Sequence, residues 1–184
     1  VELGQFMQRC DQLLVNDYAL VCEPKLDGLA IQIHYKNGVF HQALTRGDGQ
    51  QGEDITENVR TIASVPLQLY GDDYPASLYV RGEIFMRHKA FEALNIAMQQ
   101  AGKKSFANPR NAAAGSVRQH DSKITSTRPL SFYSYWLDAE DGLAAEHYQR
   151  LQQGLRWGLP TNSLVKLLST PEQIQAYIED ILSQ

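Results

Sequence analysis

The sequence predicts an α+β fold in which largely antiparallel sheets are flanked by helices. The first observation is a hairpin signal: Asn37-Gly38 separates two stretches in which apolar and polar residues alternate, and this dipeptide accepts the positive φ angles of a tight hairpin turn. The second is that further strand-like segments are interspersed with segments whose apolar residues recur at helical spacing. Strands and helices mixed in this way along one chain favour this fold class.

The predicted strands are short segments rich in apolar and aromatic residues, bounded by turn residues. They cover residues 18–24, 29–35, 39–44, 78–86 and 130–137. Gly82 interrupts the fourth strand, whereas the fifth is aromatic, with Phe132, Tyr133 and Tyr135.

The predicted helices follow from apolar spacing and from residues that start or end a helix. An amphipathic pattern begins the chain over residues 3–14. Asp54 can cap a short helix that runs through about residue 62. Asn108-Pro109 starts another helix, because proline is favoured at the first helical position, and Gly115 follows that helix. Further helices are predicted over residues 88–100, 144–157 and 171–182.

Composition limits the class of protein. The 184 residues, 43% hydrophobic and 21% charged, suit one globular domain. No apolar run approaches the roughly 20 residues that span a membrane, and no signal region begins the chain. We therefore expect a cytoplasmic protein in which Cys10 and Cys22 are reduced. The five histidines lack metal-ligand spacing, so no zinc site is expected.

The charge of the chain is unevenly distributed. Its net charge is −4, but residues 103–128 contain six basic residues and one acidic residue and are therefore +5. This segment is either a solvated loop that happens to be basic or a surface that faces phosphate groups.

The stretch Glu23-Pro24-Lys25-Leu26-Asp27-Gly28 carries the most chemistry. On an extended backbone Glu23, Lys25 and Asp27 share one face, so the triplet is either an ordinary ion cluster or the setting of a reactive amine. A free lysine with a pKa of about 10.4 is almost entirely protonated at pH 7. A nucleophilic Lys25 would therefore need desolvation, a metal cation or a base that takes its proton.

These residues and several later ones carry a resemblance to a known family. Lys25-Leu26-Asp27-Gly28 matches the KxDG motif of the covalent nucleotidyltransferases: DNA ligases, RNA ligases and mRNA-capping enzymes. The flanking segments resemble NAD-dependent DNA ligases of bacterial type, in order and over essentially the whole chain. They are Thr45–Gly49, Gly52–Ile62, Val80–Phe85, the signature Phe106–Gln119, and Trp157–Pro160.

The resemblance implies a role for each matching residue. Lys25 would attack NAD and hold AMP as a phosphoramide, with Asp27 arranging the lysine or a metal. Among the nucleotide contacts, Glu23 would lie at the adenine and Arg46 at the ribose or phosphate. Glu83 would bind the ribose hydroxyls, and Tyr135 would stack on adenine. Arg110 and Arg118 resemble arginines that act later at the nick. Without the resemblance, Arg81 and Glu83 would be interpreted as an ion pair on one face of a strand. Phe132, Tyr133 and Tyr135 would be interpreted as core residues.

The resemblance also implies what the chain lacks. We expect residues 1–184 to be the central part of an adenylation domain, incomplete at its C-terminal end, because the later lysine motifs are absent. The N-terminal nicotinamide-mononucleotide domain and the C-terminal OB-fold, zinc-finger, helix-hairpin-helix and BRCT regions are likewise expected elsewhere.

The expected activity is nick sealing in duplex DNA by a monomer, with NAD and Mg²⁺, although the fragment alone is not expected to ligate. The alternatives are an ATP-dependent ligase or capping-type enzyme, and a nucleotide-binding domain without catalysis.

Overall fold

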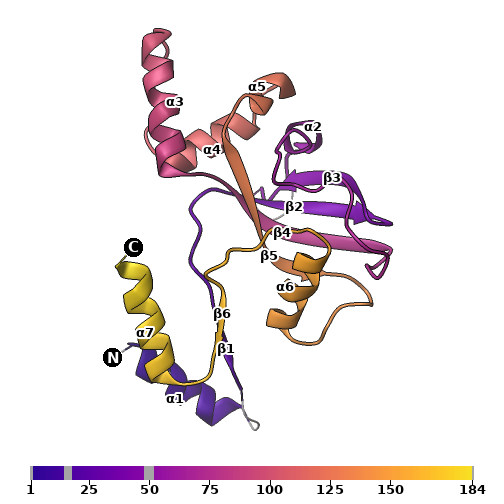
Figure 1. Ribbon diagram of the computed structural model, residues 1–184, viewed down its shortest axis with the longest axis vertical. Helices are drawn as coiled ribbons and strands as arrows, with labels where there is room; N and C mark the ends of the chain where they lie inside the picture. The colour runs from indigo at the N-terminus through magenta and orange to yellow at the C-terminus, as the bar shows by residue number, and fades with distance from the viewer. Residues whose placement is uncertain (1, 15–17, 48–51, 184) are drawn as a thin grey trace. The chain divides into compact units, whose positions relative to one another are not determined.

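A computed structural model describes residues 2–14, 18–47 and 52–183 of the chain (Figure 1). These residues form two compact units. The larger unit runs from Leu26 to Thr161, and the smaller one combines the two ends of the chain, up to Lys25 and from Asn162. None of the helices among the described residues is long and apolar enough to cross a membrane.

The larger unit is built on a four-stranded antiparallel sheet in the order β3-β2-β4-β5 (Figure 1). Its strands are β2 (Leu29–Lys36), β3 (Val39–Thr45), β4 (Ser77–Met86) and β5 (Leu130–Asp138). The turn between β2 and β3 has positive φ angles at Asn37 (48°) and Gly38 (74°). The predicted Asn-Gly hairpin and the antiparallel sheet are both confirmed.

One face of this sheet forms the core. Ile33, Val80, Phe132 and Leu137 are fully buried there. Helix α4 (Pro109–Val117) contacts β4, and helix α6 (His147–Arg156) contacts β5. Apolar burial on this face supplies the main driving force for folding the unit.

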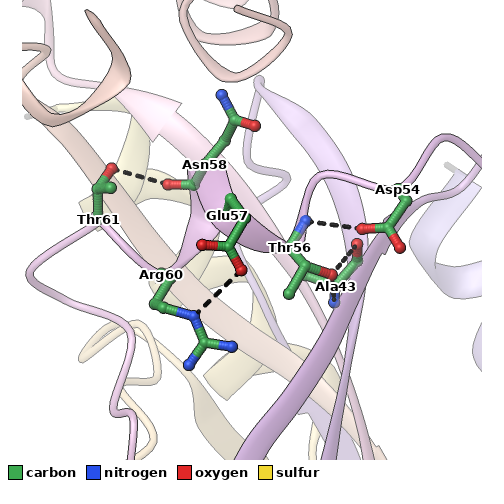
Figure 2. Close-up of polar contacts among 7 residues, drawn as sticks. All are labelled: Ala43, Asp54, Thr56, Glu57, Asn58, Arg60 and Thr61. Atoms are coloured by element: carbon green, nitrogen blue, oxygen red, sulfur yellow. Dashed lines mark hydrogen bonds and ion pairs between the residues drawn. The ribbon is translucent and has the colours of Figure 1, made fainter. Parts of the chain in front are cut away.

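Helix α2 (Thr56–Val59) is shorter than predicted, because the chain continues beyond it in turns. The amides of Thr61 and Ile62 bond to carbonyls three residues earlier, and the Thr61 hydroxyl also donates to the carbonyl of Asn58 (Figure 2). Asp54 accepts the backbone N–H of Thr56 at 2.9 Å (Figure 2), but the N-cap position is Ile55 and carries no side-chain cap hydrogen bond, so Asp54 lies one residue before the cap and the prediction that it caps the helix is wrong.

Helices α4 and α6 differ from prediction at one end each. Gly115 does not follow α4 but lies inside it, where a Cβ atom would meet the ring of Phe106 at 3.0 Å. Helix α6 begins at His147 rather than at residue 144. The backbone N–H and carbonyl of Ala144 instead bond to side chains of that helix, Gln153 and Arg150.

Two further helices belong to the larger unit. Helix α3 (His88–Gln100) has the predicted bounds and is followed by Gly102 at φ 67°. Helix α5 (Ser122–Ser126) was not predicted; its N-cap is Asp121, whose side chain accepts the Lys123 N–H. Five residues are too few to show helical periodicity.

The smaller unit contains α1 (Glu2–Leu13), β1 (Leu20–Cys22), β6 (Lys166–Leu168) and α7 (Pro171–Leu182). Strand β1 pairs antiparallel with β6. The strand predicted over residues 18–24 is therefore limited to the three residues that its partner reaches, and β6 itself was not predicted. Helix α7 has the predicted bounds and begins with a capping box formed by Thr170 and Gln173.

Candidate active site

The segment that joins β1 to β2 carries the Lys-Leu-Asp-Gly motif. Glu23, Lys25 and Asp27 are exposed, whereas Pro24 and Leu26 between them are half-buried. The predicted alternation is thus present, although strand β1 ends before it, at Cys22. Lys25 is the last residue of the smaller unit, and Asp27 lies in the larger one.

Gly28, the last residue of the motif, is fixed against strand β4. Its backbone N–H donates to Oε1 of Glu83 at 3.0 Å. A Cβ atom at Gly28 would lie 2.1 Å from the carbonyl oxygen of Ile84, so only glycine fits this close approach. Glu83 is 8% exposed. Because a carboxylate accepts several hydrogen bonds, this contact is compatible with the predicted one to ribose hydroxyls.

Three residues predicted to bind the nucleotide come together in the larger unit. The pKa of the half-buried Tyr135 phenol is raised by burial and by the Glu83 carboxylate, while Arg46 and Arg81 oppose this shift. Arg46, Arg81 and Tyr135 also line one cavity. Arg46, Glu83 and Tyr135 therefore form one cluster.

A cavity of about 480 Å³ adjoins this cluster. Its polar lining includes Gln32, Arg46, Arg81 and Tyr135. Arg81 donates through Nε to Oε1 of Gln32 at 3.3 Å, and this pair was not singled out from the sequence. A ring, an amide and cations around one cavity suit a nucleotide.

Tyr135 lies at an irregularity in the pairing of β4 with β5. Arg81 pairs with Trp136, but its neighbour Gly82 pairs with Ser134, so Tyr135 is the extra residue of a β-bulge. A bulge redirects the side chains around it. A Cβ atom at Gly82 would lie 2.2 Å from the ring of Phe132. The interruption predicted at Gly82 is therefore this bulge, and the strand itself continues through it.

Phe132, Tyr133 and Tyr135, the aromatic residues of β5 named in the sequence analysis, do not share one environment. Phe132 is fully buried in the core, as the alternative interpretation expected for all three. Tyr133 and Tyr135 are half-buried, and the Tyr133 hydroxyl accepts a hydrogen bond from Arg87 at 3.3 Å. Two of the three aromatic side chains therefore remain accessible to a ligand.

A second cavity, of about 350 Å³, lies where β2 begins and β3 ends. It shares Ala30, Thr45 and Arg46 with the first cavity. Its lining also includes Arg110 and Arg118 of the basic segment. With three guanidinium groups in its wall, this cavity suits a phosphate group.

Helix α4 positions both of these arginines. The Asn108 side chain caps the helix by accepting the Asn111 N–H at 2.7 Å, and eight residues, about two turns, separate the arginines. Arg110 donates to Oδ1 of Asp27 at 3.0 Å, and Arg118 donates to Oε2 of Glu53 at 2.5 Å.

The lysines of the basic segment, Lys103, Lys104 and Lys123, do not line either of these two cavities. Two arginines of the basic segment, Arg110 and Arg118, therefore line a cavity, and the phosphate-facing interpretation of the segment stays a prediction.

The structure leaves part of the predicted site outside its description. Residues 48–51, which include Asp48 and Gly49 of the second motif, lie outside the described residues. The structure also adds a residue to the site: Glu53, which accepts the hydrogen bond from Arg118. Glu53 belongs to the segment Gly52–Ile62 that carries the resemblance, but the sequence analysis gave it no role.

The motifs and this geometry agree with the comparison to known families. All residues, 1–184, match the family described as NAD-dependent DNA ligase adenylation domain. The chain belongs to this family. It is similar to the DNA ligase of Shewanella denitrificans, with 54% identity over 178 residues. That match covers 95% of this chain and 26% of the relative, so the adenylation domain chain spans about a quarter of the relative's length.

Membership of the adenylation domain family bears on the earlier alternatives. It supports the NAD-dependent interpretation over ATP-dependent ligases and capping enzymes. The α+β prediction with antiparallel sheets and flanking helices also holds for this adenylation domain.

Proposed function

We propose that the protein containing this chain is an NAD-dependent DNA ligase that seals nicks in duplex DNA through a covalent lysyl-AMP intermediate. One observation carries the proposal. The backbone N–H of the motif glycine, Gly28, donates a hydrogen bond to Glu83, and Arg46 and Tyr135, which interact electrostatically with one another and with Glu83, line one cavity. The family match supports it.

In the proposed first step, the Lys25 amine attacks the phosphorus of the AMP half of NAD. A phosphorus–nitrogen bond forms, and the bond from that phosphorus to the bridging oxygen of the pyrophosphate breaks. Nicotinamide mononucleotide leaves with the bridging oxygen and its electron pair, and the amine loses its proton. Positioning and charge neutralisation supply most of the rate in such transfers.

The surrounding residues would hold the nucleotide. Tyr135 would stack on the adenine, with Glu23 at the same end of the nucleotide. Glu83 would accept hydrogen bonds from the ribose hydroxyls. Arg46, which lines both cavities, would lie between the ribose and the phosphate.

Mg²⁺ is proposed as the metal of the reaction. Among residues 2–14, 18–47 and 52–183, no three histidine, cysteine or acidic side chains are grouped to hold a metal ion. Mg²⁺ is commonly held by one or two carboxylates together with substrate phosphates, so Asp27 with a bound nucleotide would fit it. When bound, the ion would neutralise phosphate charge.

Nicked DNA is the proposed macromolecular partner, and Arg110 and Arg118 would contact its phosphates. We propose that a cytoplasmic monomer carries out the reaction. In this proposal residues 1–184 are the central part of the adenylation domain. The nicotinamide-mononucleotide domain and the later lysine motifs, OB-fold, zinc-finger, helix-hairpin-helix and BRCT regions belong to other parts of the protein.

Replacement of the nucleophile tests the proposal. In the full-length protein, Lys25→Ala should abolish the covalent AMP adduct formed with NAD, because the attacking amine is gone. Intact-mass spectrometry measures the adduct directly. Lys36→Ala, which removes an exposed lysine at the hairpin, should leave the adduct unchanged.

Three outcomes would contradict the proposal. An adduct that persists on the Lys25→Ala variant would identify another nucleophile. No adduct on the unmodified protein, despite measurable nucleotide binding, would favour a binding domain without catalysis. Formation of the adduct with ATP rather than NAD would favour the other enzyme class.

A further inference from the structure

Glu53, in the segment after β3, forms an ion pair with Arg118, at the end of α4. Arg118 Nε lies 2.5 Å from Glu53 Oε2, and both side chains are about half exposed (46% and 60%). Arg118 lines the smaller cavity together with Arg46 and Arg110. The pair joins residues 65 positions apart, so it ties two separate elements together at this cavity.

The backbone of Glu53 is fixed to strand β3. Its N–H donates to Oγ1 of Thr45 at 2.9 Å, and its carbonyl accepts the Thr45 N–H at 3.0 Å. At the preceding residue, Gly52, a Cβ atom would lie 2.1 Å from the Thr45 carbonyl oxygen. Thr45 lines both cavities. The carboxylate is therefore carried by a backbone held at the cavity wall.

The way in which Glu53 holds Arg118 differs from the way in which Asp27 holds Arg110. Asp27 binds a terminal nitrogen of Arg110, Nη1. Glu53 binds Arg118 through Nε, the nitrogen nearest the side-chain stem. A carboxylate at Nε does not occupy the end of the guanidinium, where two amino groups form the fork that matches phosphate oxygens.

We propose that Glu53 is a positioning residue that fixes the Arg118 guanidinium so that its terminal amino groups bind a phosphate group in the smaller cavity. The inference rests on the proposed ligase function and adds a residue to it. Arginine has a long side chain with many rotamers, and a fixed guanidinium loses less entropy on binding. The carboxylate also offsets the mutual repulsion of the three arginines around the cavity.

The phosphate could come from NAD or from the DNA, and two measurements on the full-length protein separate these sources. One is formation of the AMP adduct from NAD without DNA. The other is sealing of a nick by protein that already carries AMP. Glu53→Ala should slow the step that uses this phosphate by about ten-fold or more, because misplaced groups lose rate steeply. Glu53→Gln keeps a hydrogen-bond acceptor, so its rate for this step should lie between the rates of the parent protein and of Glu53→Ala.

Glu57→Ala is the matched control. Glu57 of helix α2 pairs with Arg60, the residue after the helix, at 3.6 Å (Figure 2). Neither residue lines the two cavities. This variant breaks a local ion pair between a glutamate and an arginine away from the cavities, so its rates should stay within about two-fold of the parent protein.

A double-mutant cycle separates positioning from a general structural role. Glu53→Ala combined with Arg118→Ala should be no slower than Arg118→Ala alone, because Glu53 acts through Arg118. Effects that multiply would overturn the proposal, as would a Glu53→Ala protein with normal rates in both measurements.

An arginine-directed dicarbonyl reagent, read by peptide mass spectrometry, tests the contact without activity. Arg118 should react several-fold faster in Glu53→Ala than in the parent, relative to Arg60, and inorganic phosphate should slow its reaction in the parent. An unchanged Arg118 rate, or no protection by phosphate, would overturn the proposal. A parent protein that forms no AMP adduct but shows this protection would overturn the ligase function and leave the phosphate contact standing.

Discussion

The two faces of the four-stranded sheet differ in what they carry. On one face, Ile33, Val80, Phe132 and Leu137 are fully buried under helices and turns. On the other face, Gln32, Arg81 and Tyr135 line a cavity. Because side chains alternate along a strand, the same strands supply both sets.

This difference separates stability from chemistry. Buried apolar side chains stabilise the fold through area removed from water. Charged and aromatic side chains beside a cavity contribute little to that term and much to recognition. Substitutions on one face should therefore change the free energy of unfolding, and substitutions on the other should change the rate of AMP transfer.

The strongest test of the comparison is Phe132→Ala on the buried face. It should lower the free energy of unfolding by about 3–5 kcal/mol, because the ring is fully buried and a cavity would remain. Denaturant titration measures the loss, and AMP adduct per folded molecule should stay near that of the parent. A loss below about 1 kcal/mol would show that this face is not the core that its burial indicates.

On the cavity face, Arg46→Gln and Glu83→Gln should each slow AMP adduct formation by about ten-fold or more while the melting temperature stays within a few degrees. The Glu83→Gln variant keeps a side-chain oxygen that can accept the Gly28 N–H, so local packing should survive. A large loss of stability with normal adduct formation would instead favour the alternative in which Arg81 and Glu83 are an ordinary strand ion pair.

The smallest expected effect lies at the rim of the sheet, where Asp54 joins β3 to α2. Hydrogen bonds from the Thr56 side chain, the Thr56 backbone and Gln42 lower the pKa of Asp54. Asp54→Ala should cost about 0.5–1 kcal/mol at pH 7, a modest value because the carboxylate is exposed.

The pH dependence of this effect has a definite sign. A lowered folded-state pKa stabilises the protein above the unfolded value of about 3.9, and this contribution is lost as the pH falls through the folded-state pKa. The difference between parent and variant should therefore shrink below about pH 4. Urea titrations at pH 7 and pH 3 measure it, and an equal difference at both would contradict this account.

Local sequence signals predicted the elements that depend on local physics. Asn37-Gly38 fixes its own turn, and Asn108-Pro109 begins α4, because the energies involved lie within a few residues. The motif residues Arg46, Glu83 and Tyr135 were chosen by resemblance, and the structure has Arg46 and Tyr135 lining one cavity, with the Glu83 carboxylate raising the pKa of Tyr135.

The features that the sequence did not predict depend on distant partners. Strand β6 exists because β1 lies opposite it, and the bulge at Tyr135 is visible only when β4 and β5 are paired. Glu53 meets Arg118 through the fold, and nothing near Glu53 in the sequence indicates that contact.

The pairing of β1 with β6 can form only late in synthesis, because the two strands lie far apart in the sequence. Cys22, three residues before Lys25, pairs with Lys166, which is 144 positions later in the chain. At about 5–20 residues per second, the ribosome needs about 7–30 s to make that span. During this interval strand β6 does not yet exist for β1 to pair with, whereas all four strands of the larger sheet, which lie within residues 29–138, are made before the interval ends. Strand β1, which precedes Lys25, is thus among the last parts of this chain to acquire its hydrogen bonds.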